Sequence, residues 1–280
     1  MTSEKLDVLV LSDIDNIPAQ DESVLARIVD PDWNAERDVI RALAKLGHRV
    51  RFAAVYDTLD PLLDAVKAQK PDLVFNLAEG FRGISYYDRD LPALLELLDL
   101  PYTGVGPAGL MLCRNKGVTK KILSSPRRKS PEFVILPRGR SVSLPARVAF
   151  PVIVKPLRGQ SSYGISKGSV VDDEKGLEER VRFMHEKMNQ SVIVEHFVRG
   201  RELYVSVLGD TRLSVLPIRE LSFGKVPDDE LKLATFKAKW DQKYRRQWGI
   251  RNTFARGITQ ELSSRISTLC KRAFRALQLL

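Results

Sequence analysis

The segment "FPVIVKPLRGQSSYGIS", residues 150–166, decides how the chain is interpreted, because an apolar run delivers a lysine into a loop rich in Gly and Ser. Three β-branched residues precede Lys155, and Ile165 resumes the apolar pattern, which predicts two short strands joined by a turn. The loop offers serine hydroxyls and glycine backbone N–H groups, which are donors that suit an anion with several oxygens. A polyphosphate would fit this loop. The alternative is an ordinary surface hairpin with a solvated lysine.

Composition indicates a globular protein. The chain has 280 residues, of which 44% are apolar, enough for one large domain or two to three small ones. No run approaches the roughly 18 apolar residues of a membrane span, and the run at residues 8–11 lacks the basic flank of a signal peptide. Cys113 and Cys270 form no CxxC pair, which fits a reducing compartment. We therefore expect a cytoplasmic protein with no membrane partner.

Charge is distributed unevenly along the chain. Of the net charge of +10, nine units fall in residues 237–280, which hold eleven Lys or Arg and only two acids. A nucleic-acid binder would carry exposed aromatics among the basic residues or a known motif, and neither is evident. We expect no nucleic-acid partner, although a basic nucleic-acid-binding protein stays open as an alternative. Either the basic end faces an anionic ligand, or it lacks an acidic partner. The three histidines are too scattered to suggest a metal cluster.

The first 105 residues alternate between strand and helix patterns. Apolar runs at residues 6–13 and 71–77 predict strands. Between them, helical spacing at residues 35–46 ends at Gly47, and another strand is predicted before residue 56. A helix in "LPALLELLDLPYTG", residues 91–104, leads to a fourth predicted strand. Such alternation predicts a mostly parallel sheet with covering helices. The G-x-G-x-x-G at residues 104–109 follows the fourth strand rather than the first, so we interpret it as a coincidental turn.

The later segments predict a second α/β region. We expect a helix in "CRNKGVTKKIL" (113–123), another at residues 174–188, a strand–turn–strand unit at residues 191–210 and a final helix from about Thr259.

One of these segments, "VIVEHFVRGRE" at residues 192–202, offers a slot for a nucleoside. Glu195 and Glu202 flank a strand end and a Gly turn, with Phe197 and Val198 between them. An adenine base needs flat apolar contact, and ribose hydroxyls need a carboxylate acceptor. The alternative is a hairpin whose glutamates are solvated.

Six segments, in this order and with similar spacing, resemble the ATP-grasp ligases, and within them the D-alanine–D-alanine ligase group. They are "VFNLAEGFRG", "LLELLDLPYTG", "RNKGVTKKIL", "FPVIVKPLRGQSSYGIS", "VIVEHFVRGREL" and "KAKW". The resemblance implies an α/β fold with an N-terminal Rossmann-like pre-ATP-grasp domain at residues 1–105. An ATP-grasp fold of two α+β subdomains would follow, at residues 106–198, including a linker helix, and at residues 199–280, the last being incomplete.

The resemblance also implies a function. The family joins a carboxylate to an amine through an acyl phosphate, using ATP and magnesium, and forms a dipeptide for peptidoglycan biosynthesis. An amino acid or small carboxylate and an amine are the expected substrates, and a homodimer is the expected assembly.

Carried over position by position, the family pattern implies two sets of functional residues. The nucleotide-binding set comprises Lys116, Lys155 and Ser162 at the phosphates, Glu195, Phe197 and Val198 at the adenine, and Glu202 at the ribose. The catalytic set comprises Lys239 at the transferring phosphate, Ser161 in the loop over the phosphates, and Glu22 at the amino group of the first substrate. Converging lysines suit phosphoryl transfer because charge spreads over oxygens in its transition state.

Several departures from the family pattern leave the substrate pair open. Gln160 stands where the family loop carries Gly, Trp240 stands where Tyr is frequent, and Glu79 replaces a histidine. The later Arg, Asp and Glu-x-Asn residues that hold magnesium in the family do not occur before Leu280. We therefore predict no metal ligands and little or no ligase activity for this 280-residue chain. A non-catalytic nucleotide-binding protein derived from the family is the alternative.

Overall fold

The computed structural model describes residues 4–15, 33–124 and 130–279. The chain divides into two compact units, Met1–Met111 and Leu112–Leu280. Each unit has its own hydrophobic core, and the structure confirms a mixed α/β fold. The further boundary that the sequence places at residue 198, inside the second unit, stays a prediction.

The N-terminal unit is built on a three-stranded parallel sheet. Its strands are β1 (Asp7–Ser12), β2 (Arg49–Ala54) and β3 (Leu73–Asn76), in the order β2-β1-β3. Every residue of the central strand β1 is buried. A parallel strand covered on both faces requires such a continuous apolar run, so the run predicts this position in the sheet.

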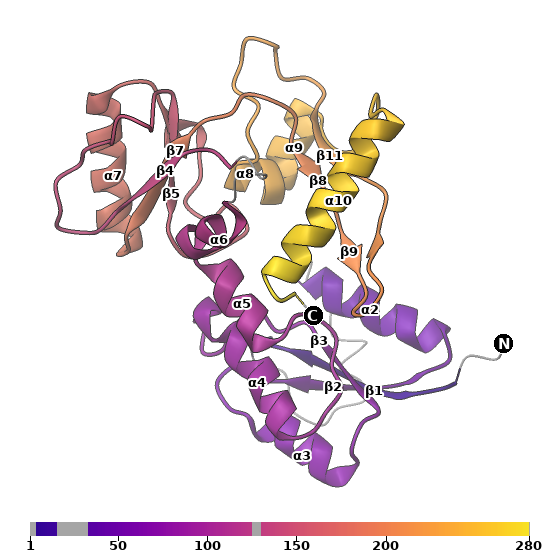
Figure 1. Cartoon of the computed structure of the whole chain (residues 1–280). Coiled ribbons are helices and arrows are strands. Elements are labelled where there is room, and N and C mark those ends of the chain that lie inside the picture. Colours follow the sequence, from indigo (N-terminus) through magenta and orange to yellow (C-terminus); the bar gives the residue numbers. More distant parts are fainter. Residues whose placement is uncertain (1–3, 16–32, 125–129, 280) are drawn as a thin grey trace. The chain divides into compact units, whose positions relative to one another are not determined.

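Helices cover both faces of this sheet, as Figure 1 shows. They are α2 (Asn34–Lys45) on one face and α3 (Asp60–Ala68) and α4 (Asp90–Leu97) on the other, with the 3-10 helix η2 (Ser85–Arg89) before α4. Because side chains alternate along a strand, Val10 packs with Ile40 of α2, while Leu9 packs with Leu62 and Leu95 of the opposite layer. Where the sequence predicts a fourth strand, the structure has a single parallel bridge, between Tyr102 and Val74 of β3.

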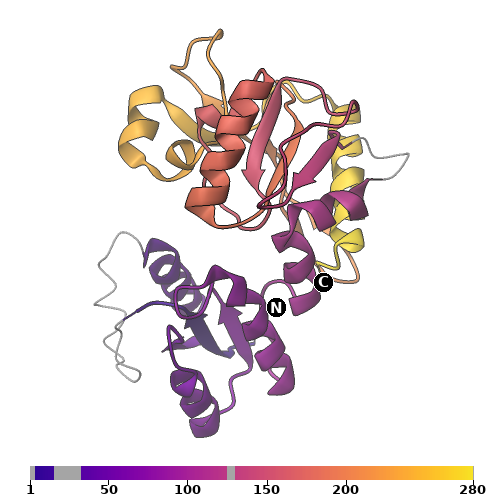
Figure 2. The ribbon, with the colours of Figure 1, turned by 90° about the vertical axis from the view of Figure 1, so that its left-hand side faces the viewer.

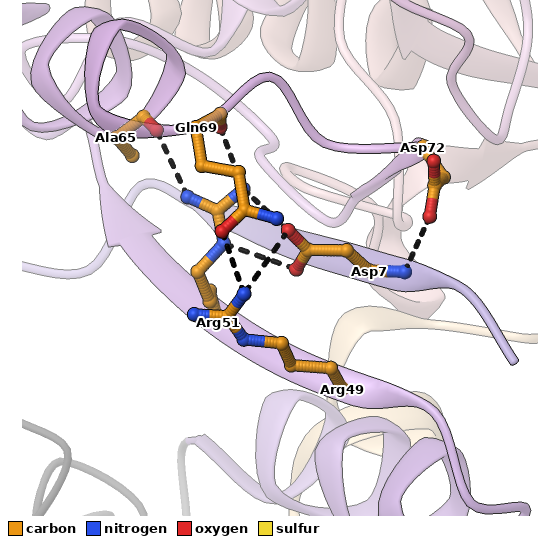
Figure 3. A network of polar contacts seen from close by, with 6 residues as sticks. All are labelled: Asp7, Arg49, Arg51, Ala65, Gln69 and Asp72. Carbon is orange, nitrogen blue, oxygen red and sulfur yellow. Dashed lines mark hydrogen bonds and ion pairs between the residues drawn. The ribbon is translucent and has the colours of Figure 1, made fainter.

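A polar network joins the start of β1 to β2 and α3 (Figure 3). The Arg51 guanidinium donates to the carboxylate of Asp7 through Nε and Nη2, at 3.1 Å each, and to the backbone carbonyls of Ala65 and Gln69, at 2.9 Å each. These carbonyls belong to the C-terminal end of α3, where a positive charge is favourable. One guanidinium therefore connects two strands and a helix. Arg49, which is mostly exposed, reaches Asp7 only at 4.0 Å.

The C-terminal unit contains a four-stranded antiparallel sheet. Its strands are β4 (Phe133–Leu136), β7 (Val192–His196), β5 (Val152–Pro156) and β6 (Val170–Val171), in that order across the sheet. Helix α7 (Glu174–Met188) covers one face (Figure 2) and packs its Leu177, Val181 and Met184 on the strands. The opposite face carries the charged residues Lys155 and Glu195.

Two strand pairings that the sequence predicts are wrong. Ile165 does not begin the second strand of a hairpin, because Ser161 and Ser162 adopt positive φ and Ile165 N–H donates to the Ser162 carbonyl within a turn. The partner of β5 is β6, which follows the short 3-10 helix η3 (Lys167–Ser169). Likewise, β7 does not pair with β8 (Leu203–Tyr204), which joins another sheet.

The rest of this unit consists of small sheets and helices. Strands β11 (Arg219–Phe223) and β12 (Ile250–Phe254) form a three-stranded sheet with β8, in the order β12-β11-β8. Strands β9 (Val207–Leu208) and β10 (Ser214–Val215) form a two-stranded sheet. The helices are α5 (Pro107–Arg114), α6 (Lys116–Leu123), α8 (Phe236–Trp240), α9 (Gln242–Trp248) and α10 (Gln260–Ala276). Helix α5 begins in the first unit. The final helix is confirmed, with Thr259 as its N-cap. Within residues 4–15, 33–124 and 130–279, no helix has the length and apolar character needed to cross a bilayer.

The Arg51 network generates a prediction about the N-terminal unit. We expect Arg51→Gln to destabilise it by about 2 kcal/mol, because the largely buried Asp7 carboxylate and two carbonyls lose their donor. Amide hydrogen exchange of β1 and β2 measures the loss as faster exchange. Arg49→Gln is the matched control and should cost less than about 0.5 kcal/mol, since Arg49 is mostly exposed. Equal effects of the two substitutions would contradict this assignment.

Candidate functional site

The polar site lies on the face of the four-stranded sheet that is turned away from α7. Val154 and Val194 belong to the core with α7, so their strand neighbours Lys155 and Glu195 point to the opposite face. The register pairs Ile153 with Glu195 and Lys155 with Ile193. Lys155 and Glu195 are therefore diagonal neighbours, within reach of each other's side chains.

Helix α6 lies close against this face. Its N-cap, Asn115, accepts hydrogen bonds from the backbone N–H groups of Gly117 and Val118 at 3.0 and 3.2 Å. A Cβ atom on Gly117 would lie only 2.5 Å from Cδ1 of Ile135 on β4. A side chain at this position would displace the Ile135 methyl group, and the close approach of the helix brings Lys116 and Lys120 to the sheet.

Three lysines converge near the buried carboxylate of Glu195, which is 6% exposed. Lys155 donates to Oε1, and Lys120 forms an ion pair with Oε2 at 2.7 Å. Burial alone would raise the pKa of Glu195, but the two lysines outweigh it and hold that pKa below its usual value. Glu195 is therefore ionised at neutral pH.

Lys116 completes the cluster. Its Nζ donates to the backbone carbonyls of Pro156, at 3.0 Å, and Gly159, at 2.7 Å. Burial, followed by the positive charge of Lys155, lowers the pKa of Lys116 to about 8, against a partial offset from Glu195. Such a lysine holds its proton only weakly, and a neighbouring anion would favour the charged form.

The Gly/Ser loop, residues 159–165, is attached to helix α8 and the residues before it. Ser162 Oγ donates to the Ala234 carbonyl at 2.7 Å, and Trp240 Nε1 donates to the Ser161 carbonyl at 2.9 Å. The N–H of Phe236 donates to the Ile165 carbonyl at 3.1 Å. Three hydrogen bonds thus hold the loop against the segment that carries Lys239.

The same segment is tied to Glu202. The carboxylate of Glu202 accepts a hydrogen bond from the Ala234 N–H at 2.9 Å. Lys239 Nζ lies 5.7 Å from the ring centre of Tyr204, within the range of a cation–π contact. Residues 234–240, which include Lys239, therefore connect the loop to Glu202.

The structure brings the candidate residues of the sequence together only in part. Lys116, Lys155 and Glu195 form one cluster, while Ser161, Ser162 and Glu202 contact residues 234–240, the segment that contains Lys239. Phe197 is half-buried and its N–H donates to the Pro151 carbonyl at 2.8 Å, whereas Val198 is 62% exposed. Glu22 lies outside the described residues.

Sequence reasoning missed Lys120. Its position four residues after Lys116 on a predicted helix places both lysines on one side of the helix, and this spacing is the signal that could have found it. For metal binding, the part of the chain that the structure describes contains no group of three or more His, Cys, Asp or Glu side chains suited to an ion.

Comparisons with known proteins identify relatives of the whole chain. The family model "D-ala D-ala ligase C-terminus" matches residues 132–280. The protein y4sG of Sinorhizobium fredii is 31% identical over 258 residues, covering 89% of this chain and 71% of y4sG. A D-alanine–D-alanine ligase of Bordetella petrii is 34% identical over 196 residues, and one of Clostridium botulinum is 30% identical over 188 residues. These alignments cover 67% and 66% of this chain but only 58% and 59% of the two ligases.

Solved structures agree on the fold. The crystal structure of D-alanine–D-alanine ligase from Bacillus anthracis superposes with a TM-score of 0.68 at 19% identity, covering 98% of this chain and 79% of that one. The structure of the same ligase complexed with ATP gives a TM-score of 0.66, at 19% identity, with 97% and 77% covered. The family model covers more than half of the chain, and the chain therefore belongs to the D-alanine–D-alanine ligase family, with the ATP-grasp fold.

Proposed function

We propose that the chain binds ATP at the lysine cluster and acts as an ATP-dependent carboxylate–amine ligase. The observation that carries the proposal is the convergence of Lys116, Lys120 and Lys155 near one buried carboxylate, Glu195. Three ammonium groups against one carboxylate leave an excess of positive charge in a partly buried place, which is unfavourable without an anionic partner. A triphosphate supplies that partner.

The arrangement suggests a role for each candidate residue. Lys116 and Lys155 would hold the phosphates, and the hydroxyl of Ser162, which donates to the Ala234 carbonyl in this structure, would turn to donate to them. Glu195, Phe197 and Val198 would line the adenine, and Glu202 would accept from the ribose. Support for ATP also comes from the related ligase of Bacillus anthracis, which was crystallised with ATP.

The chemistry follows from phosphoryl transfer. A substrate carboxylate oxygen attacks the γ-phosphorus, ADP leaves, and an acyl phosphate results. The amine of the second substrate then attacks the carbonyl carbon, inorganic phosphate leaves, and an amide bond forms. Lys239 would stabilise the charge on the transferring phosphoryl group, and Ser161 would close the loop over it.

The substrates are proposed as an amino acid or small carboxylate and an amine, of the kind joined in peptidoglycan precursors, in the cytoplasm. A homodimer is expected from the family. Magnesium would serve as charge neutraliser in the complete family enzyme. The described residues do not offer a carboxylate cluster that fits this ion, so no step is assigned to it.

ATP binding by calorimetry is the first test. We expect the wild-type chain to bind ATP and Lys155→Ala to bind at least about ten-fold more weakly, because a charge-assisted contact to phosphate is lost. Lys121→Ala is the matched control, since Lys121 is an exposed lysine of the same helix as Lys116, and it should stay within about two-fold.

Equal affinities of the two variants would contradict the proposed site. Phosphate release in the presence of amino acids distinguishes the two readings of the family resemblance: binding with turnover indicates a ligase, and binding without turnover over a wide range of amino acids and magnesium concentrations indicates a nucleotide-binding protein.

The lowered pKa of Lys116 predicts a pH dependence. Its pKa, about 8 in the nucleotide-free protein, means that the ammonium loses its charge as the pH rises through about 8. ATP affinity should therefore fall above this pH, by up to about ten-fold per pH unit. Calorimetry from about pH 7 to about pH 9.5 measures the fall. Lys116→Arg keeps its charge over this range and should flatten the profile, whereas Lys121→Arg should not; a flat wild-type profile would refute the assignment.

The attachment of the loop to α8 predicts an effect of Trp240. Trp240→Phe keeps an aromatic ring at this position but removes the indole N–H that donates to the Ser161 carbonyl. A single hydrogen bond contributes about 1 kcal/mol. Amide hydrogens of residues 160–165 should exchange about five-fold faster, and the dissociation constant for ATP, measured by calorimetry, should rise. Trp248→Phe is the control, because Trp248 packs on Tyr244 instead. If both variants left exchange in the loop unchanged, the attachment would have no role.

A further inference from the structure

We propose that the pocket at the turn from α9 to β12 binds a small oxyanion, the phosphate or carboxylate group of a ligand other than the nucleotide at the lysine cluster. The pocket has a volume of about 550 Å³ and is lined by Gln242, Arg245, Arg246, Gly249, Ile250, Arg251 and Asn252. Three guanidinium groups and no carboxylate belong to this lining. None of the residues proposed to bind ATP lines this pocket, although Arg245 Nη1 also donates to the backbone carbonyl of Lys239 at 3.4 Å.

The surrounding sequence supplies almost no compensating negative charge. Residues 231–260 hold eight Lys or Arg and a single acid, Asp241. The carboxylate of Asp241 caps α9 by accepting from the Tyr244 N–H at 2.9 Å. On the neighbouring strand β11, Glu220 is held by two hydrogen bonds from Arg201, at 2.7 and 2.6 Å. The nearest acids of the elements that form the pocket are thus already engaged.

The backbone brings the three arginines to one place. Arg245 and Arg246 are in the last turn of α9, Gly249 makes the turn with a φ of +62°, and Arg251 follows on β12. The conformation of Gly249 is one that other residues rarely adopt, so the turn is specific. Sharp reversal of the chain at this glycine sets Arg251 beside the end of the helix.

The guanidinium groups differ in how they are engaged. Arg245 Nη1 donates to the Ala238 carbonyl at 2.6 Å, which fixes this side chain against the end of α8. Across the described residues, neither Arg246 nor Arg251 has an ion pair or a side-chain hydrogen bond. Like charges around one pocket repel each other, and an oxyanion would relieve this repulsion. The planar fork of Arg suits the oxygens of a phosphate or a carboxylate.

The test uses the full chain, with inorganic phosphate and glutamate as probes, titrated by calorimetry at low ionic strength. The pocket variant is Arg246→Gln with Arg251→Gln. Its matched control is Arg265→Gln with Arg272→Gln, which removes the same charge from exposed positions of α10. We expect saturable binding of at least one probe, weakened about ten-fold or more in the pocket variant and less than about two-fold in the control.

Two further variants locate and support the result. If Lys155→Ala still binds the phosphate or glutamate probe, the binding belongs to the pocket. If Lys155→Ala no longer binds the probe, the probe binds at the lysine cluster and the proposal is overturned, independently of whether the chain binds ATP. Arg246→Lys with Arg251→Lys keeps the charge without the fork and should retain part of the affinity, which excludes misfolding as the cause of a loss.

The probes identify the source of the oxyanion. Stronger binding of phosphate assigns the pocket to a phosphorylated ligand, and stronger binding of glutamate assigns it to an acidic substrate. The proposal is overturned if neither probe shows saturable binding, or if the control substitutions weaken binding as much as the pocket substitutions do. It is also overturned if only a single-stranded oligonucleotide binds and the pocket variant and the control variant lose affinity for it equally.

Discussion

The ion cluster of Glu195 with Lys155 and Lys120 is the interaction on which the rest of the C-terminal unit depends. It stands on a sheet whose other face forms the core with α7, so strand alternation alone separates the apolar face from the charged one. Helix α6 then covers the charged face, with Gly117 packed closely against Ile135 of β4. Packing of this kind delivers charged groups into a partly buried site without leaving them unpaired.

Much of the fold could be predicted from the sequence, because the decisive signals are local. The apolar run at residues 6–13 predicts a strand of a mostly parallel sheet, and β1 is that strand; the apolar period predicts a final helix from about Thr259, and α10 is that helix. The pairing of strands could not be predicted, because it depends on contacts that are distant in the sequence. Residues 192–196 and 203–204 look like a hairpin, yet they belong to different sheets.

The candidate site shows the same division. Lys116, Lys155 and Glu195 were assigned by resemblance, and their side chains do converge. Lys120 resembles any solvated helical lysine until the register of β7 places Glu195 opposite it. The attachment of the Gly/Ser loop through the indole of Trp240 was equally invisible, since a backbone carbonyl of Ser161 is its acceptor and the sequence does not reveal such partners.

The position of the Arg51 network has a further consequence for the N-terminal unit. It lies at the amino ends of the parallel strands β1 and β2, whereas ligands of such sheets bind beyond the carboxyl ends. The Arg51 network therefore leaves the carboxyl ends of these strands outside its contacts. Substitutions beyond those carboxyl ends would leave the hydrogen bonds of Arg51 in place, so they should cost little of the stability that this network supplies.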